Sequence, residues 1–257
     1  MNWSSSSRTG LKSTPIRHVE VTFCMGKAKA NRKFLAHHTT CCFCGGTQPA
    51  TEVDHIPSRS CFDERQFPEG FEFPSCNACN SGSSSDEQVV AMFSRVYSHP
   101  AVPAKPNEIQ KYLKGISNNN PEILSEMSED IQKISDDTYA LHLGENSHEK
   151  FLSVLRKWAK AFHYRETGRI VPKGARIYAN FWTAANADNI PQFCLYGTVH
   201  KLRRSGKNIA DQCGYITRTD PNDLSLGTYT FMFRRSFLAL MMVDFHGQVL
   251  GDELIHP

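Results

Sequence analysis

Two CxxC pairs, Cys41-Cys-Phe-Cys44 and Cys76-Asn-Ala-Cys79, bracket the segment Thr51-Glu-Val-Asp-His-Ile-Pro57. One such pair is typical of a redox dithiol, whereas two in tandem predict a four-cysteine zinc site. Each pair supplies two thiolates from one tight turn, and zinc takes four of them at the corners of a tetrahedron. The expected ligands are Cys41, Cys44, Cys76 and Cys79. Such a site has no open coordination position, so the zinc would be structural. A redox protein, which would bind no zinc, stays open as an alternative.

The composition is that of a folded chain. Its 257 residues include 29 basic and 26 acidic side chains, and 40% are hydrophobic, which excludes a wholly disordered, collagen-like or coiled-coil protein. The nine cysteines cannot all pair, so a secreted disulfide framework fits poorly. The start of the chain is Ser-rich and polar, unlike a signal peptide, and no apolar run approaches the roughly 20 residues of a membrane helix. These features predict a reducing, cytoplasmic compartment.

The segment between the pairs carries the candidate chemistry. Thr51, Val53 and His55 alternate with Glu52 and Asp54, which predicts a short strand that stops at Pro57. An Asp-His dipeptide inside a four-cysteine frame, with Asn80 directly after the last cysteine, resembles the HNH (His-Me finger, ββα-metal) endonucleases. It is similar to phage recombination endonucleases and to bacterial defence-associated HNH proteins. The resemblance covers residues 38–98.

The resemblance implies a role for each of three residues. His55 would be the general base that activates water, and an imidazole suits this task near neutral pH. Asp54 and Asn80 would hold a catalytic divalent cation, and their oxygen ligands suit Mg²⁺ or Mn²⁺. A cation beside the phosphate would neutralise the charge that develops during hydrolysis. The products implied are 5′-phosphate and 3′-hydroxyl ends.

Some residues depart from the family pattern or leave two interpretations open. The middle residue of the family motif falls near Phe71, which cannot bind a metal and is expected in the core. Residues 61–70 are expected to form an excursion, with Asp63 and Glu64 at a solvated tip. Arg59 is either a clamp for the scissile phosphate or an ordinary surface arginine. Glu87 is either an outer partner of the catalytic metal or, as we favour, an acidic residue of a first helical turn.

The fold class predicted is α+β: a zinc-stapled ββα-metal module, then a helical segment and a small antiparallel β-rich region. The expected units are a basic N-terminal extension (1–37, about the first 12 residues disordered), the nuclease module (38–99), an acidic helical linker (100–150) and an α/β C-terminal domain (151–257). Helices are expected at 26–34, from Ser85 or Asp86 onward, and at 107–114, 121–135 and 151–166, the last capped by Gly168. Strands are expected at 177–178, 193–196, 215–216, 229–233 and 237–245.

The charge is distributed unevenly along the chain. Residues 151–207 hold 11 basic and 2 acidic side chains. The helix expected at 151–166 places Arg156, Lys157, Lys160 and His163 opposite its apolar face, which favours a basic groove for a phosphate backbone. Lys201, Arg203 and Arg204 would extend this groove. Cys42, like Cys24, Cys61, Cys194 and Cys213, is expected to pack as a small apolar residue.

Taken together, these patterns predict a metal-dependent HNH endonuclease that hydrolyses phosphodiester bonds of DNA, as an effector of an anti-phage (antiviral) defence system. The cofactors would be a structural Zn²⁺ and a catalytic Mg²⁺ or Mn²⁺. RNA and branched DNA remain open as substrates, and a second copy of the chain or a defence-complex subunit as partner. The alternative is a non-catalytic zinc-ribbon nucleic-acid-binding protein, in which Asp54, His55 and Asn80 are incidental.

Overall fold

The computed structural model describes residues 27–95, 106–129, 131–135, 138–141, 143–233 and 236–248. The expected disordered start and Cys24 lie outside these ranges. The described part is a mixed α+β structure with antiparallel sheets, as predicted. None of the helices within it is long and apolar enough to cross a membrane.

The two cysteine pairs flank a small antiparallel ribbon. Strand β1 (Glu52–His55) pairs with β2 (Glu72–Ser75), which sets Asp54 opposite Phe73 and His55 opposite Glu72. The strand predicted before Pro57 is thereby confirmed. Short α2 (Asn77–Ser81) begins right after Cys76, and α3 (Ser84–Arg95) follows it. We call residues 41–80 the cysteine frame. Helix α1 (Lys27–His37) precedes it and confirms the basic helix expected there.

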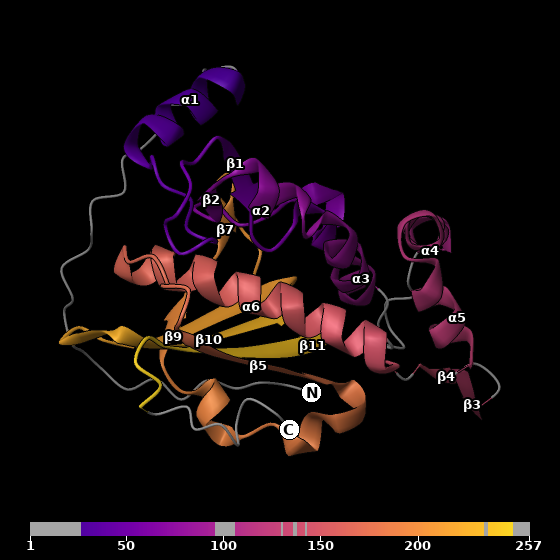
Figure 1. Cartoon of the computed structure of the whole chain (residues 1–257). Coiled ribbons are helices and arrows are strands. Elements are labelled where there is room, and N and C mark those ends of the chain that lie inside the picture. Colours follow the sequence, from indigo (N-terminus) through magenta and orange to yellow (C-terminus); the bar gives the residue numbers. More distant parts are fainter. Residues whose placement is uncertain are drawn as a thin grey trace.

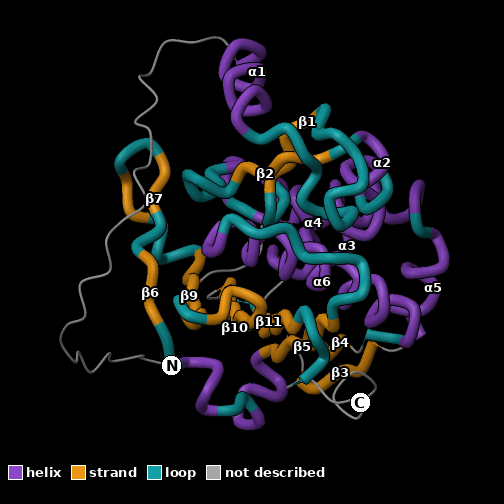
Figure 2. The backbone as a smooth tube through the Cα atoms, turned by 60° about the vertical axis from the view of Figure 1, so that its left-hand side comes forward, coloured by secondary structure: helices purple, strands orange, loops and turns teal. Residues whose placement is uncertain are grey.

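One long helix, α6 (Glu145–Thr167), separates this frame from the main sheet (Figures 1 and 2). It ends at Gly168, whose positive φ of 71° makes the predicted left-handed cap. It begins six residues before the expected residue 151. The sequence did not predict these first turns, because they are polar and show no helical spacing of apolar residues. The sheet has the antiparallel order β5 (Arg176–Thr183), β11 (Phe237–Asp244), β10 (Asp223–Phe233), β9 (Cys213–Asp220) and β6 (Thr198–His200).

The remaining elements lie at the edges. They are the hairpin β7 (Arg203–Arg204) and β8 (Lys207–Asn208), the turns η1 (Arg59–Cys61), η2 (Asp63–Arg65), η3 (Ala184–Asn189) and η4 (Gln192–Leu195), the helices α4 (Pro106–Asn119) and α5 (Pro121–Glu129), and the hairpin β3 (Ile131–Ser135) and β4 (Thr138–Leu141). Two predictions were wrong here. The helix expected at 121–135 stops at Glu129, because β4 offers the next segment a strand partner. Residues 193–196 lie in a 3₁₀ turn between Pro191 and Gly197 that buries Cys194, not in a strand.

The cysteine frame, α6 and the sheet share one hydrophobic core rather than forming separate units. Phe71 of the frame is fully buried, as expected, with its ring centroid 5.8 Å from that of Phe162 on α6 and 5.4 Å from that of Tyr215 on β9. Trp158 and Phe231 complete this aromatic centre. A substitution that disturbs the packing of the cysteine frame is therefore expected to disturb the packing of the sheet as well.

The polar face of α6 is not an open groove, contrary to our expectation. The helix lies between the cysteine frame and the sheet (Figure 1), and residues of its polar face contact both. Lys157 has a side chain only 10% exposed, and Lys160 donates to the Phe43 carbonyl at 3.1 Å. His163 is fully buried and bonded to Tyr229 and to the Leu224 carbonyl. The sequence shows the charges of one helix face but not what covers it.

Candidate functional site

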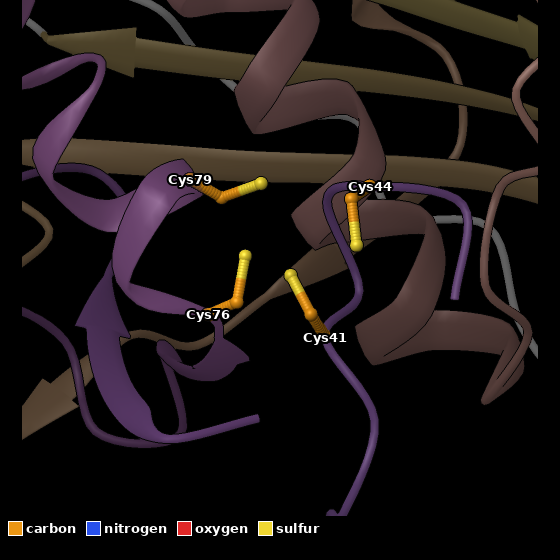
Figure 3. Close-up of side chains that lie close together, drawn as sticks. All are labelled: Cys41, Cys44, Cys76 and Cys79. Carbon is orange, nitrogen blue, oxygen red and sulfur yellow. The ribbon is translucent and has the colours of Figure 1, made fainter. Parts of the chain in front are cut away.

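The four predicted zinc ligands come together. The sulfur atoms of Cys41, Cys44, Cys76 and Cys79 all lie within 4.8 Å of one another and point into a common centre (Figure 3). The strand ribbon supports them, since Cys41 N–H donates to the Gln48 carbonyl and the adjacent Cys42 N–H to the Pro74 carbonyl. Four thiols at this separation could hold a metal ion such as zinc, whose preference for thiolate ligands they match.

One of these thiols is already biased toward the thiolate form. Burial acts to raise the pKa of Cys44, but hydrogen bonds from Thr47, Cys41 and the Gln48 backbone outweigh it and lower the pKa to about 7. The spare Cys42 is fully buried outside the group, and its pKa is raised, mainly by burial. Cys61, Cys194 and Cys213 are also buried, as predicted for packing residues.

Asp54 lies in a buried ion cluster that the sequence did not predict. Its Oδ1 accepts the backbone N–H of His55 at 2.7 Å, and its Oδ2 lies 2.6 Å from the Lys157 ammonium. That ammonium also lies 2.8 Å from Glu87 Oε1 and donates to Ser83 Oγ at 2.6 Å. These side chains come from β1, α6 and the start of α3, which they join. Glu87 does stand in the first turn of α3, and its carboxylate also neutralises Lys157.

The charges in this cluster depend on one another. Burial alone would lower the pKa of Lys157, but the carboxylates of Glu87 and Asp54 outweigh it and raise that pKa. Burial raises the pKa of Glu87, and the negative charge of Asp54 raises it further while Lys157 opposes both. The ammonium thus holds two carboxylates together in a place from which water is largely excluded. It also offsets part of the negative charge that Asp54 would offer to a second cation.

Replacing Lys157 by methionine is expected to destabilise the fold by about 3–5 kcal/mol, because two buried carboxylates lose their shared cation. A raised pKa means that the contribution of Lys157 is complete below its ordinary pKa of 10.5 and is lost as the pH rises through the folded value. The stability difference between wild type and Lys157→Met should therefore be constant near neutral pH and shrink in strong base. Urea unfolding at several pH values measures it.

The control is Arg156→Met on the next position of α6. Arg156 pairs at the surface with Glu149, whose side chain is 64% exposed, and such pairs contribute about 0–1 kcal/mol. Equal stabilities for the two variants would show that the Lys157 cluster does not hold the frame to α6.

Asn80 is bonded to Glu52 rather than to Asp54. It donates its amide to Glu52, which also accepts from Asn77 at 2.8 Å. These two hydrogen bonds lower the pKa of the Glu52 carboxyl. Since Glu52 and Asp54 are two residues apart on β1, their side chains leave the same face of the strand. Asn80 therefore lies on the face of β1 that also carries Asp54. Glu52 adds a carboxylate on this face that could bind a metal ion, and the sequence pattern did not identify it.

His55 leaves β1 on the opposite face, where aromatic and charged groups surround it. Its ring meets that of Phe67 edge-on at 4.6 Å between centroids. Its neighbour across the ribbon is Glu72, whose pKa is raised chiefly by burial. Directly opposed residues in an antiparallel pair share a face, so a carboxyl lies beside the imidazole. Nothing in the sequence spacing identified Glu72.

The excursion at residues 61–70 is packed on the core in part. Phe62 and Phe67 are buried. Asp63 forms an ion pair with Arg95 of α3, and its backbone N–H donates to Gln212 at 3.0 Å, but its side chain is still 49% exposed. Asp63 is therefore at a solvated position, as expected, and it also has an ion-pair partner that the sequence did not indicate. Glu64 is exposed, as expected.

Arg59 lies on η1 with its guanidinium carbon 5.9 Å from the Phe67 ring centroid. Arg204, from the distant β7–β8 hairpin, lies over the same ring at 4.0 Å. Both arginines are candidate phosphate ligands by sequence, but they are 145 positions apart, so the sequence does not indicate that they lie against the same ring.

No protein-family model, curated protein or solved structure matches this chain. The site is therefore interpreted from its own residues.

Proposed function

We propose that the chain is a metal-dependent endonuclease of the HNH type that hydrolyses phosphodiester bonds of DNA. The observation that carries the proposal is the placement of His55 at the end of β1, beside Asp54 and inside the cysteine frame. Asn80 is tied to the same strand through Glu52. A frame of four cysteines that served only to fold the chain would not require an aspartate, a histidine and an asparagine in this order.

The proposed structural metal is zinc, bound by Cys41, Cys44, Cys76 and Cys79. Four thiolate ligands leave it no position for a substrate, so its task is to hold β1 and α2 together. The catalytic residues then stand on a ribbon whose ends are both anchored.

The donor chemistry on the Asp54 side of β1 suits a hard cation. Asp54 and Glu52 offer carboxylate oxygens. Asn80 donates through its amide nitrogen, and its amide oxygen accepts no hydrogen bond from the residues that the structure describes, so it could bind a ligand. His55 leaves β1 on the other face, but in the resembling family the twisted and bent end of this strand still lets the aspartate reach the metal beside the phosphate. Mg²⁺ or Mn²⁺ held there would stabilise the charge that builds up on the phosphate. Lys157 already compensates Asp54, so a divalent cation has to compete with a resident ammonium. We therefore propose a weak site.

His55 performs the proton transfer in this proposal. A neutral imidazole accepts a proton from a water molecule aligned with the phosphorus, and the hydroxide formed attacks the phosphorus. The bond from phosphorus to the 3′ oxygen then breaks, and this oxygen takes a proton from solvent to leave as the 3′-hydroxyl. The edge-on contact with Phe67 limits the directions the imidazole can take. Asp54 is bonded to the His55 backbone N–H at 2.7 Å and so keeps the end of the strand in place.

Titration of Mn²⁺ into zinc-loaded protein is expected to show one weak site in addition to the tight zinc. Asp54→Asn removes the negative charge at nearly constant shape, so it should abolish the weak site. The free Mn²⁺ signal in electron paramagnetic resonance measures the binding. Glu149→Gln, which removes an exposed carboxylate of α6, is the matched control and should leave the site unchanged.

The same titration separates the proposal from its alternative. If Asp54→Asn binds Mn²⁺ as the wild type does, Asp54 holds no cation, and the zinc-ribbon protein without catalysis is favoured. A role in anti-phage defence and a partner subunit belong to the proposal only through the family resemblance.

A further inference from the structure

Two arginines from distant parts of the chain converge beside His55. Arg59 and Arg204 both lie against the ring of Phe67, at 5.9 and 4.0 Å from its centroid. The same ring contacts the His55 imidazole at 4.6 Å. The Phe67 ring is thus a shared neighbour of two guanidinium ions and one imidazole. Within the described residues, the side chains of these two arginines form no ion pair and no hydrogen bond.

Holding these cations together has an energetic cost. Burial lowers the pKa of Arg59, and the positive charges of Arg65 and Arg204 lower it further. Glu72 is the carboxyl that offsets this repulsion, but it is largely buried and its own pKa is raised, mainly by burial. Stacking on an aromatic face stabilises a guanidinium by only about 1 kcal/mol at partly exposed sites. An anion between the arginines would remove the remaining repulsion.

The position of Arg204 is built into the fold. It is the last residue of β7, and the following turn has positive φ at both central residues, Ser205 (51°) and Gly206 (76°), as a tight two-residue hairpin requires. Glu69 ties this hairpin to the excursion that carries Phe67. Its backbone N–H donates to the Arg203 carbonyl at 2.9 Å, and its carboxylate accepts the Ser205 N–H at 2.6 Å. Arg204 is therefore placed by two anchored segments, unlike a free surface arginine.

We propose that Arg59 and Arg204 form a binding site for one phosphodiester group of a nucleic acid strand, next to His55. Planar guanidinium groups match the oxygens of a phosphate, to which each can donate two hydrogen bonds. The inference rests on the proposed function, since the phosphodiester bound by the two arginines would be the one that is hydrolysed with His55 as the general base. It also moves the basic substrate surface from α6, whose lysines are covered, to the β7–β8 hairpin.

Binding of a fluorescently labelled DNA duplex, measured by anisotropy at several salt concentrations, tests the site. The parent protein is His55→Ala, so that no cleavage disturbs the measurement. Arg204→Gln and Arg59→Gln are each expected to weaken binding about tenfold and to reduce the slope of log K against log salt by about 1. Arg203→Gln is the control, because Arg203 is the exposed neighbour on the same hairpin. Its effect should be no more than about twofold.

Two outcomes would overturn the inference. One is that Arg203→Gln weakens binding as much as Arg204→Gln, which would indicate a diffuse basic surface; the other is that neither Arg59→Gln nor Arg204→Gln changes binding. Thermal unfolding of each variant shows that a loss of binding is not a loss of fold. A chain that binds DNA through both arginines but never cuts it would contradict the nuclease proposal alone. A chain that cuts DNA equally well without them would contradict the phosphate site alone.

Discussion

Removal of the zinc is expected to unfold residues 41–80 and to destabilise the whole described core. Structural zinc sites contribute apparent binding free energies of about 10–16 kcal/mol, more than the stability of a typical domain. The cysteine frame shares its hydrophobic core with α6 and the sheet, so the loss should spread beyond the frame. Circular dichroism and thermal unfolding before and after treatment with a zinc-selective chelator measure the effect.

Cys41→Ala and Cys42→Ala form the matched pair for this prediction. The two cysteines are adjacent and both fully buried, but only Cys41 belongs to the group of four sulfur atoms. Cys41→Ala should lose the bound zinc and fold poorly. Cys42→Ala should retain zinc and lose about 1 kcal/mol of stability, as a typical small core change does. Equal zinc contents in the two variants would contradict the assigned ligands.

Replacement of His55 by alanine is expected to reduce DNA cleavage at least about 100-fold, because general-base catalysis contributes roughly 10²–10⁴ in rate. The fold should survive, since His55 lies at the end of β1 and is only half-buried. Initial rates of cleavage of a labelled duplex in the presence of Mg²⁺ give the effect.

His37→Ala provides the control for this variant. His37 is an exposed histidine at the end of α1, and its ring is hydrogen-bonded to the Lys33 carbonyl of its own helix. Its removal should leave cleavage unchanged. A His55→Ala protein that retains its zinc and cuts as fast as wild type would exclude His55 as the base.

The elements that could be predicted from sequence are those whose signal is local. The spacing of the cysteines predicted a cluster that the structure forms. Periodicity identified β1 and α6, and aromatic, β-branched and apolar composition identified the strands around 215, 230 and 240. The apolar run at 193–196 predicts a strand, but a short run of this kind can equally fold as a single turn that buries one side chain, as it does here. The helix expected at 121–135 ends at Glu129, because residues 131–135 pair as a strand with β4 and this pairing outweighs their helix propensity.

The environment of the candidate site could not be predicted because it depends on contacts between distant segments. Lys157 meets Asp54 across more than 100 positions of the chain, and Arg204 meets Arg59 across more still. The sequence indicated that α6 has a basic face, but only the packing of that face on the cysteine frame shows that its lysine is an internal counter-ion. The positive charge proposed to bind the substrate therefore comes in part from the two-stranded β7–β8 hairpin, which no periodic pattern in the sequence predicts.

The most direct test of the nuclease proposal is the conversion of supercoiled plasmid by folded, zinc-loaded protein with and without added Mg²⁺. The proposal predicts nicked or linear DNA only when Mg²⁺ or Mn²⁺ is present, with 5′-phosphate and 3′-hydroxyl ends, and none from the His55→Ala variant. Intact plasmid with either cation, or equal cleavage by wild type and His55→Ala, would contradict it.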